Sequence, residues 1–147
     1  MNGDTDSLYQ LARRVLLDAL EALEPQREAL ILVGAQAVYL HTGEGDLVVA
    51  PFTKDADLAL NPTVLRDEPI LAGALSEAGF RPGAHPGSWL GQNDIPVDLL
   101  VPGTLGGPGR RGARLGIHGN RAARKVAGME GALVDRVKRE IKALDPE

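Results

Sequence analysis

The sequence predicts an α/β or α+β fold, in which helices pack on a β-sheet. Apolar residues recur at helical spacing near the N-terminus, short apolar runs typical of buried strands follow, and the two patterns alternate along the chain. The chain has 147 residues, of which 44% are hydrophobic and 24% are charged. These values predict a single globular domain over residues 1–147.

Composition excludes several classes of protein. There is no cysteine, which excludes a disulfide scaffold, thiol catalysis and a cysteine zinc site. No apolar run approaches the roughly 20 residues of a membrane helix, so we expect no membrane contact. The N-terminus is polar and acidic, unlike a secretory signal, and a cytoplasmic location is therefore expected. One Trp, two Tyr and two Phe are too few for a base-stacking platform.

The N-terminal segment is expected to form an amphipathic helix over residues 6–24, ending near Pro25. Its apolar side chains recur at steps of three and four residues: Leu8, Leu11, Ala12, Val15, Leu16, Ala19, Leu20 and Leu23. Such a stripe packs on a core, and the sheet is the expected partner. Helix-mediated dimerisation or docking of a partner protein is the alternative interpretation of the same stripe.

The other elements follow from apolar runs and from Gly and Pro. Strands are expected at residues 29–33, 53–60 and 95–101. Helices are expected at residues 35–41, 68–78 and 130–144, the second of them closed by Gly79. Residues 81–94 are expected to be irregular, with Phe80 and Trp89 as core or loop anchors. The expected core spans residues 29–102.

Charge is distributed unevenly along the chain. Residues 1–102 carry 15 acidic and 6 basic side chains, whereas residues 103–125 carry 6 basic and no acidic ones. Residues 103–112 also contain five glycines, so a basic, Gly-rich loop is predicted over 103–125. This loop either faces an anionic ligand or is a solvated segment without a binding role. Its best candidates for phosphate contact are Arg110, Arg111 and Arg114.

Three aspartates form the clearest candidate site. Asp55 and Asp57 are two residues apart on an expected strand, so both side chains leave one face, with Cβ atoms about 6–7 Å apart. Asp98 lies within another apolar strand and joins them if the two strands are neighbours. Oxygen ligands of this kind suit Mg²⁺ or Mn²⁺. Aspartates that cap loops or pair with lysine or arginine are the alternative.

A candidate phosphate-binding turn precedes the aspartates. Gly34 follows an apolar strand directly, and Ala35 and Gln36 begin the next expected helix. A glycine at this position lets the backbone approach a phosphate, and the helix N-terminus supplies N–H donors. Any tight turn between strand and helix can also use glycine. Lys54 is within reach of a phosphate but leaves the strand on the face opposite to Asp55.

Three motifs together carry a resemblance to a known family: Leu32-Val-Gly-Ala-Gln-Ala-Val38, Phe52-Thr-Lys-Asp-Ala-Asp-Leu-Ala-Leu60 and Ile95-Pro-Val-Asp-Leu-Leu-Val101. In order and spacing, residues 29–102 resemble the nucleotidyltransferase superfamily related to polymerase β. The closest resemblance is to the minimal bacterial branch that includes AbiEii-type toxins. The chain departs from the family at Gly34-Ala35, where Gly-Ser or Gly-Gly is usual, and the interval between Gly34 and Asp55 is longer than usual.

The resemblance implies a mixed sheet flanked by helices and an Mg²⁺-dependent transferase. Asp55 and Asp57 would hold two metal ions, and Asp98 would hold the catalytic one and help deprotonate the acceptor. A nucleoside triphosphate would place its phosphates over Gly34, and its nucleoside monophosphate would pass to a hydroxyl group of RNA or protein. A role in a toxin–antitoxin or phage-defence pair, with an antitoxin as partner, is also implied.

Two other functions remain open on sequence grounds. The Ala35 departure and the short C-terminal region favour a catalytically inactive module that binds nucleotide or RNA on the same fold. The apolar faces of the first and last expected helices favour a protein-interaction subunit, including a homodimer.

Overall fold

The computed structural model describes residues 3–33, 56–103 and 112–126. Its α-helices are α1 (Gly3–Ala22) and α3 (Leu71–Glu77). Short 3-10 helices are η1 (Glu24–Ala29), η3 (Gln92–Asp94) and η5 (Gly116–His118). The strands are β1 (Leu30–Val33), β2 (Ala56–Leu60), β3 (Arg81–Pro82), β4 (Ser88–Leu90), β5 (Pro96–Pro102) and β6 (Arg124–Val126).

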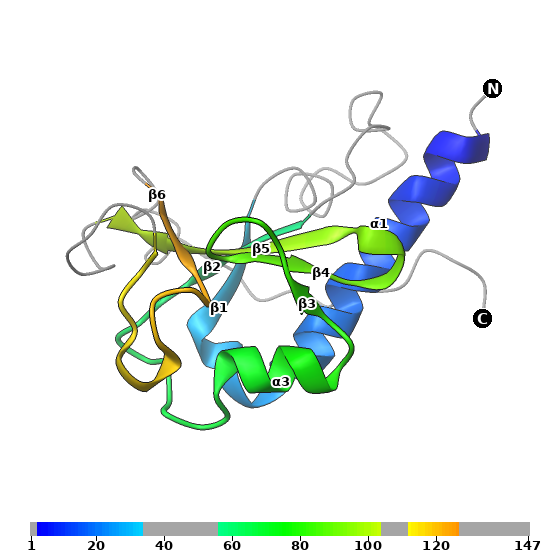
Figure 1. Ribbon diagram of the computed structural model, residues 1–147. Helices are drawn as coiled ribbons and strands as arrows, with labels where there is room; N and C mark the ends of the chain where they lie inside the picture. The colour runs from blue at the N-terminus through cyan, green and yellow to red at the C-terminus, as the bar shows by residue number, and fades with distance from the viewer. Residues whose placement is uncertain (1–2, 34–55, 104–111, 127–147) are drawn as a thin grey trace.

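The described strands form one mixed sheet of six strands in the order β1-β2-β5-β4-β3, with β6 also paired to β5. β2 and β6 run parallel to β5, whereas the β1–β2, β4–β5 and β3–β4 pairs are antiparallel. Figure 1 shows helix α3 on one side of this sheet and α1 running past its edge onto the same side. The predicted α+β class with a mixed sheet is therefore confirmed.

The hydrophobic core lies between the sheet and the two helices. The expected stripe of α1 supplies part of it, since Val15, Leu16 and Ala19 are fully buried. Alternate residues of the central strands supply the other part: Ala56, Leu58 and Leu60 of β2, and Val97, Leu99 and Val101 of β5. Because successive strand residues leave opposite faces, these buried residues identify the core face of each strand.

The helices differ from the expected bounds at their ends. Helix α1 begins at Gly3 and ends at Ala22, and η1, with Pro25 in its first turn, follows it. Helix α3 covers only Leu71–Glu77 of the expected 68–78, because Ile70 at its N-cap is extended (φ −64°, ψ 129°). Gly79 follows its C-terminus at φ +96°, a conformation that favours glycine, as the sequence predicted.

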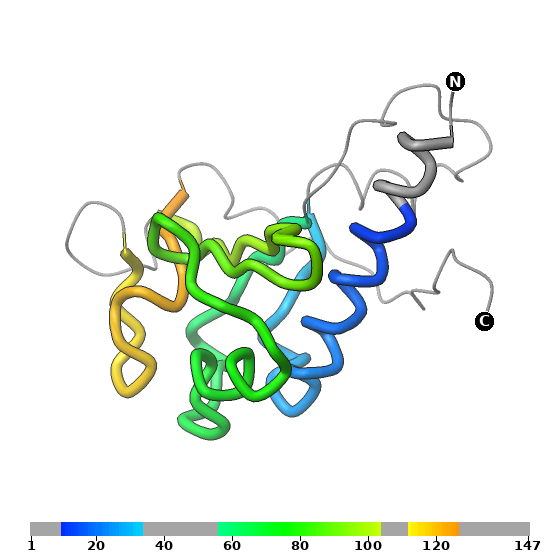
Figure 2. Tube along the Cα trace, turned by 45° about the vertical axis from the view of Figure 1, so that its right-hand side comes forward, coloured from blue at the N-terminus to red at the C-terminus, as the bar shows by residue number. Residues whose placement is uncertain are grey.

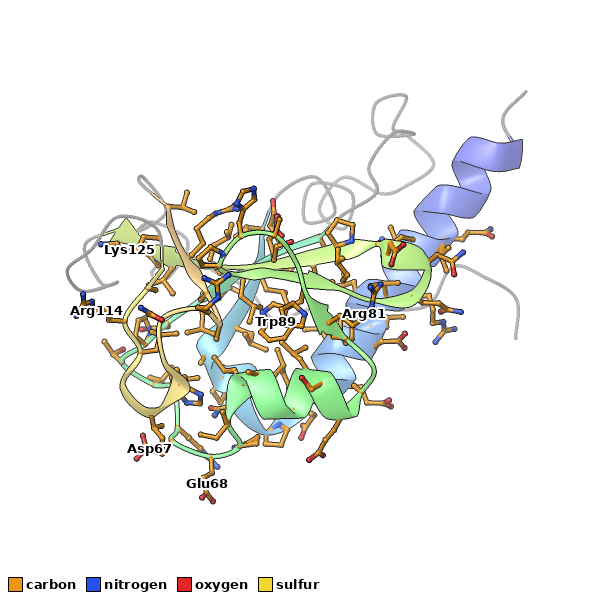
Figure 3. The ribbon with its side chains drawn as sticks, viewed as in Figure 1. Asp67, Glu68, Arg81, Trp89, Arg114 and Lys125 are labelled. Atoms are coloured by element: carbon orange, nitrogen blue, oxygen red, sulfur yellow. The ribbon has the colours of Figure 1, made fainter. Side chains whose placement is uncertain are left out.

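Residues 81–94, expected to be irregular, instead add two strands to the sheet. β4 pairs with β5, and β3 pairs with β4 as the edge strand. Trp89 is the reason that β4 is held in place: its ring is buried in the core, and Nε1 donates a hydrogen bond to the Ala122 carbonyl at 3.0 Å. Figure 3 shows Trp89 between the sheet and α3. The prediction that Trp89 and Phe80 anchor the core is confirmed.

Part of the predicted basic loop is regular structure. Residues 112–126 fold back on themselves through the Gly112–Arg124 bridge and a hydrogen bond from Ala113 N–H to the Ala123 carbonyl at 2.9 Å. The segment ends in β6, which pairs with β5. Figure 2 shows this segment, in yellow and orange, at the end of the molecule away from α1. Residues 104–111, and the helices expected at 35–41 and 130–144, lie outside the described residues.

Two buried polar side chains hold the loop between β2 and α3. Gln26 Nε2 donates to the carbonyls of Arg66 (2.8 Å) and Pro69 (3.0 Å), and Gln26 Oε1 accepts from Arg66 N–H at 2.9 Å. His118 Nδ1 accepts from Leu71 N–H at 3.1 Å, and His118 Nε2 lies 2.7 Å from the Arg66 carbonyl. Since Nδ1 is an acceptor, the neutral ring carries its proton on Nε2. Both side chains are therefore structural.

Candidate functional site

The centre of the candidate site is a pair of aspartates on neighbouring parallel strands. The register of β2 and β5 places Asp57 directly opposite Asp98. Neighbouring strands lie about 4.8 Å apart, so the two Cα atoms are separated by one strand spacing. The structure thus brings together two of the three predicted carboxylates, because β2 and β5 are neighbours in the sheet.

Both aspartates leave the face of the sheet opposite to the core. Asp57 lies between the core residues Ala56 and Leu58, and Asp98 lies between the core residues Val97 and Leu99. Alternation along each strand therefore places both carboxylates on the second face. Each side chain is half-buried. Half-burial restricts the carboxylates while leaving them within reach of a ligand.

Ser88 is a third polar residue beside the two aspartates, on the next strand of the sheet. β4 pairs Ser88 with Asp98, so Val33, Asp57, Asp98 and Ser88 lie across four neighbouring strands in one row. Gly83 leaves room for the hydroxyl group, because a Cβ at Gly83 would lie 2.6 Å from Ser88 Oγ. Sequence reasoning assigned Ser88 no role, because the three residues Ser88-Trp89-Leu90 are too short a run, with two adjacent apolar residues, to show the alternation of a strand.

A second row on the same face contains a basic residue. Leu100 follows Asp98 by two residues on β5, and β6 places Arg124 directly opposite Leu100. β4 and β6 lie along the same edge of β5, where Leu99 N–H donates to the Gly87 carbonyl at 2.8 Å. A Cβ at Gly87 would lie 2.7 Å from the Arg124 amide nitrogen, so the two strands meet there. Arg124 was not among the predicted phosphate ligands.

The remaining predicted site residues are placed as follows. Arg114 is exposed, on the segment that precedes β6, and Figure 3 shows it at the outer edge of the molecule. The other predicted site residues lie outside the described residues: Gly34, Ala35, Gln36, Lys54, Asp55, Arg110 and Arg111.

Two opposed carboxylates are oxygen donors of the kind that Mg²⁺ and Mn²⁺ prefer. Like charges on directly paired strand positions repel, and a divalent cation held by both removes this repulsion. Asp57 and Asp98 are therefore candidate ligands of one shared metal ion. Within residues 3–33, 56–103 and 112–126, no group of three His, Cys, Asp or Glu side chains could hold an ion. The third expected carboxylate, Asp55, is outside these ranges.

An open groove of about 650 Å³ lies on the other side of the sheet, between the end of α1 and helix α3. Ala22, Ile70 and Ala74 contribute to its apolar walls, and Glu68 and Glu77 are its acidic residues. This groove is separated from Asp57 and Asp98 by the sheet itself. Its two acidic residues come from a loop and a helix and do not lie on paired strand positions as Asp57 and Asp98 do, so the aspartate pair is the better candidate for chemistry.

Comparisons with protein-family models, with curated proteins and with solved structures find no match for this chain. The resemblance to nucleotidyltransferases consequently depends on the three sequence motifs. Among the helices of the described ranges, none has the length and apolar character needed to cross a bilayer.

Proposed function

We propose that this protein is a metal-dependent nucleotidyltransferase, which moves a nucleoside monophosphate from a nucleoside triphosphate to a hydroxyl group of RNA or protein. The observation that carries the proposal is the direct opposition of Asp57 and Asp98 on parallel strands. The three motifs and their order support the same reading. An antitoxin partner belongs to this proposal through the resemblance to AbiEii-type toxins.

The chain's own residues would divide the chemistry. Asp57 and Asp98 would hold Mg²⁺ or Mn²⁺, which supplies charge neutralisation at the phosphates. Asp98 would accept the proton of the attacking hydroxyl group. The acceptor oxygen forms a bond to the α-phosphorus, the bond to the bridging oxygen breaks, and pyrophosphate leaves with that electron pair. Positioning and electrostatics would supply most of the rate enhancement.

The test is a transfer assay with each α-labelled nucleoside triphosphate, Mg²⁺, and total cellular RNA and protein. Asp98→Asn should lower labelled product by about 10²–10⁴-fold, the contribution of a positioned base. Asp57→Asn should lower it as well, because it removes a ligand of the metal ion that neutralises charge at the phosphates. Asp67→Asn is the matched control, because Asp67 is exposed and lies on the helix side of the sheet (Figure 3). Circular dichroism verifies that each variant is folded.

Undiminished product in Asp57→Asn would contradict the proposal, and so would the absence of product from the folded wild-type protein. Nucleotide binding without turnover would favour the inactive binding module. A co-purifying protein in place of nucleotide binding would favour the interaction subunit.

A further inference from the structure

Arg124 shares a face of the sheet with the two aspartates. Residues directly opposite each other on neighbouring strands leave the same face, and Arg124 is opposite Leu100. Leu100 is two residues from Asp98 on β5 and therefore leaves the same face as Asp98. The basic segment of the sequence thus places one of its side chains beside the acidic pair.

The separation between Arg124 and Asp98 suits a polyphosphate. Arg124 is one strand across and two residues along from Asp98, which corresponds to about 8 Å between Cα atoms. A metal ion held at the aspartates and a guanidinium group at Arg124 would bind neighbouring parts of one anion. The guanidinium fork matches the oxygens of a phosphate group, so the side chain has suitable geometry as well as charge.

Arg124 is also held firmly by its surroundings. Gly87 N–H donates to the Arg121 carbonyl at 3.0 Å, and Trp89 Nε1 donates to the Ala122 carbonyl at 3.0 Å. On its other side, β6 is bridged to Gly112. Arg124 itself is half-buried, whereas Arg114 is exposed on the segment that precedes β6. A side chain on a fixed backbone loses less entropy on binding, which favours Arg124 over Arg114 as a ligand.

We infer that Arg124 binds the triphosphate of the nucleotide substrate, across the sheet face from the metal-binding aspartates. This inference rests on the proposed function, since it names a residue that recognises the substrate of that reaction. It assigns a specific phosphate contact within the basic segment and places it on the same sheet as the carboxylates.

The test is the affinity for inorganic tripolyphosphate and for a non-hydrolysable nucleoside triphosphate, measured by calorimetry with Mg²⁺ present. Arg124→Gln should weaken both by about ten- to a hundredfold, the effect of losing hydrogen bonds to a charged group. Arg124→Lys, which keeps the charge but loses the fork, should give an intermediate affinity. Lys125→Gln is the control, because Lys125 pairs with Val101 and leaves the other face; its affinity should equal that of the wild type.

Unchanged affinity in Arg124→Gln would overturn the inference, as would equal losses in Arg124→Gln and Lys125→Gln. If Arg124→Gln fails to fold, Arg124→Lys is the deciding variant, and wild-type affinity of Arg124→Lys for tripolyphosphate would overturn a bidentate contact of Arg124 with the phosphates. If the wild-type protein transfers nucleotide while Arg124→Gln binds normally, this inference alone fails. If the wild type neither binds triphosphate nor transfers nucleotide, the proposed function fails with it.

Discussion

Asp57 of β2 and Asp98 of β5 lie directly opposite each other, although they are far apart in the sequence. Both strands are buried on their core face, so a shift of register by one residue would move either aspartate into the apolar core. The hydrophobic pattern that builds the core therefore also fixes the two carboxylates on the opposite face. Folding and the candidate chemistry depend on the same alternation of residues.

Gly87 is expected to be essential for the junction of β4, β5 and β6. A Cβ there would lie 2.6 Å from the Leu99 carbonyl oxygen and 2.7 Å from the Arg124 amide nitrogen. Gly87→Ala should cost about 1–2 kcal/mol for its positive φ and a further 1–3 kcal/mol for crowding. Gly79 also has a positive φ, but no atom lies within 4 Å of the Cβ position, so Gly79→Ala should cost only the about 1–2 kcal/mol for the backbone conformation. Urea denaturation measures the free energy of unfolding of both variants, and equal losses of stability in the two would contradict the crowding argument.

Gln26 is expected to stabilise the loop before α3. Gln26→Leu removes the partner of Arg66 N–H and of the Pro69 carbonyl, while the Arg66 carbonyl keeps His118. Leaving such groups unpaired should lower the free energy of unfolding by about 2–3 kcal/mol. Gln92→Leu, at an exposed position on η3, should change it by less than about 0.5 kcal/mol. Thermal or urea unfolding of both variants tests this, and similar losses would show that the Gln26 hydrogen bonds contribute little.

The pH dependence of stability should contain a contribution from Asp18 on α1. Burial raises the pKa of Asp18 above 3.8, Arg14 opposes the rise, and Glu21 adds to it. A raised pKa in the folded state means that protonated Asp18 stabilises the protein below pH 3.8, and that this stability is lost as pH rises through the folded pKa. Asp18→Asn should therefore be more stable than the wild type at neutral pH and lose that advantage near pH 3.8. Urea titrations at both pH values provide the measurement; an advantage independent of pH would argue against it.

The sequence was sufficient to predict the central strands and, for Asp57, the face of the strand that its side chain leaves. Asp57 alternates with Ala56 and Leu58, and this local pattern shows which face a side chain leaves. It does not show which strands are neighbours. The opposition of Asp57 and Asp98 is a long-range pairing, which the sequence predicts only on the condition that the two strands are neighbours.

The elements that sequence analysis missed are short or depend on distant partners. β6 has three residues in a basic, Gly-rich context and becomes a strand through pairing with β5. β4 is also only three residues long, and it is held in place by the buried Trp89, whose Nε1 donates a hydrogen bond to the Ala122 carbonyl. The roles of Gln26 and His118 depend on backbone carbonyls far along the chain, which no local pattern reveals.

The most direct test of the central claim is Mn²⁺ binding by electron paramagnetic resonance, with the wild type, Asp57→Asn, Asp98→Asn and the Asp67→Asn control. If the two aspartates share one ion, the wild type and Asp67→Asn bind Mn²⁺ equally well. Each of the other variants then loses about tenfold or more in affinity, and each tenfold corresponds to about 1.4 kcal/mol. Wild-type affinity in Asp57→Asn or Asp98→Asn would contradict the shared metal site.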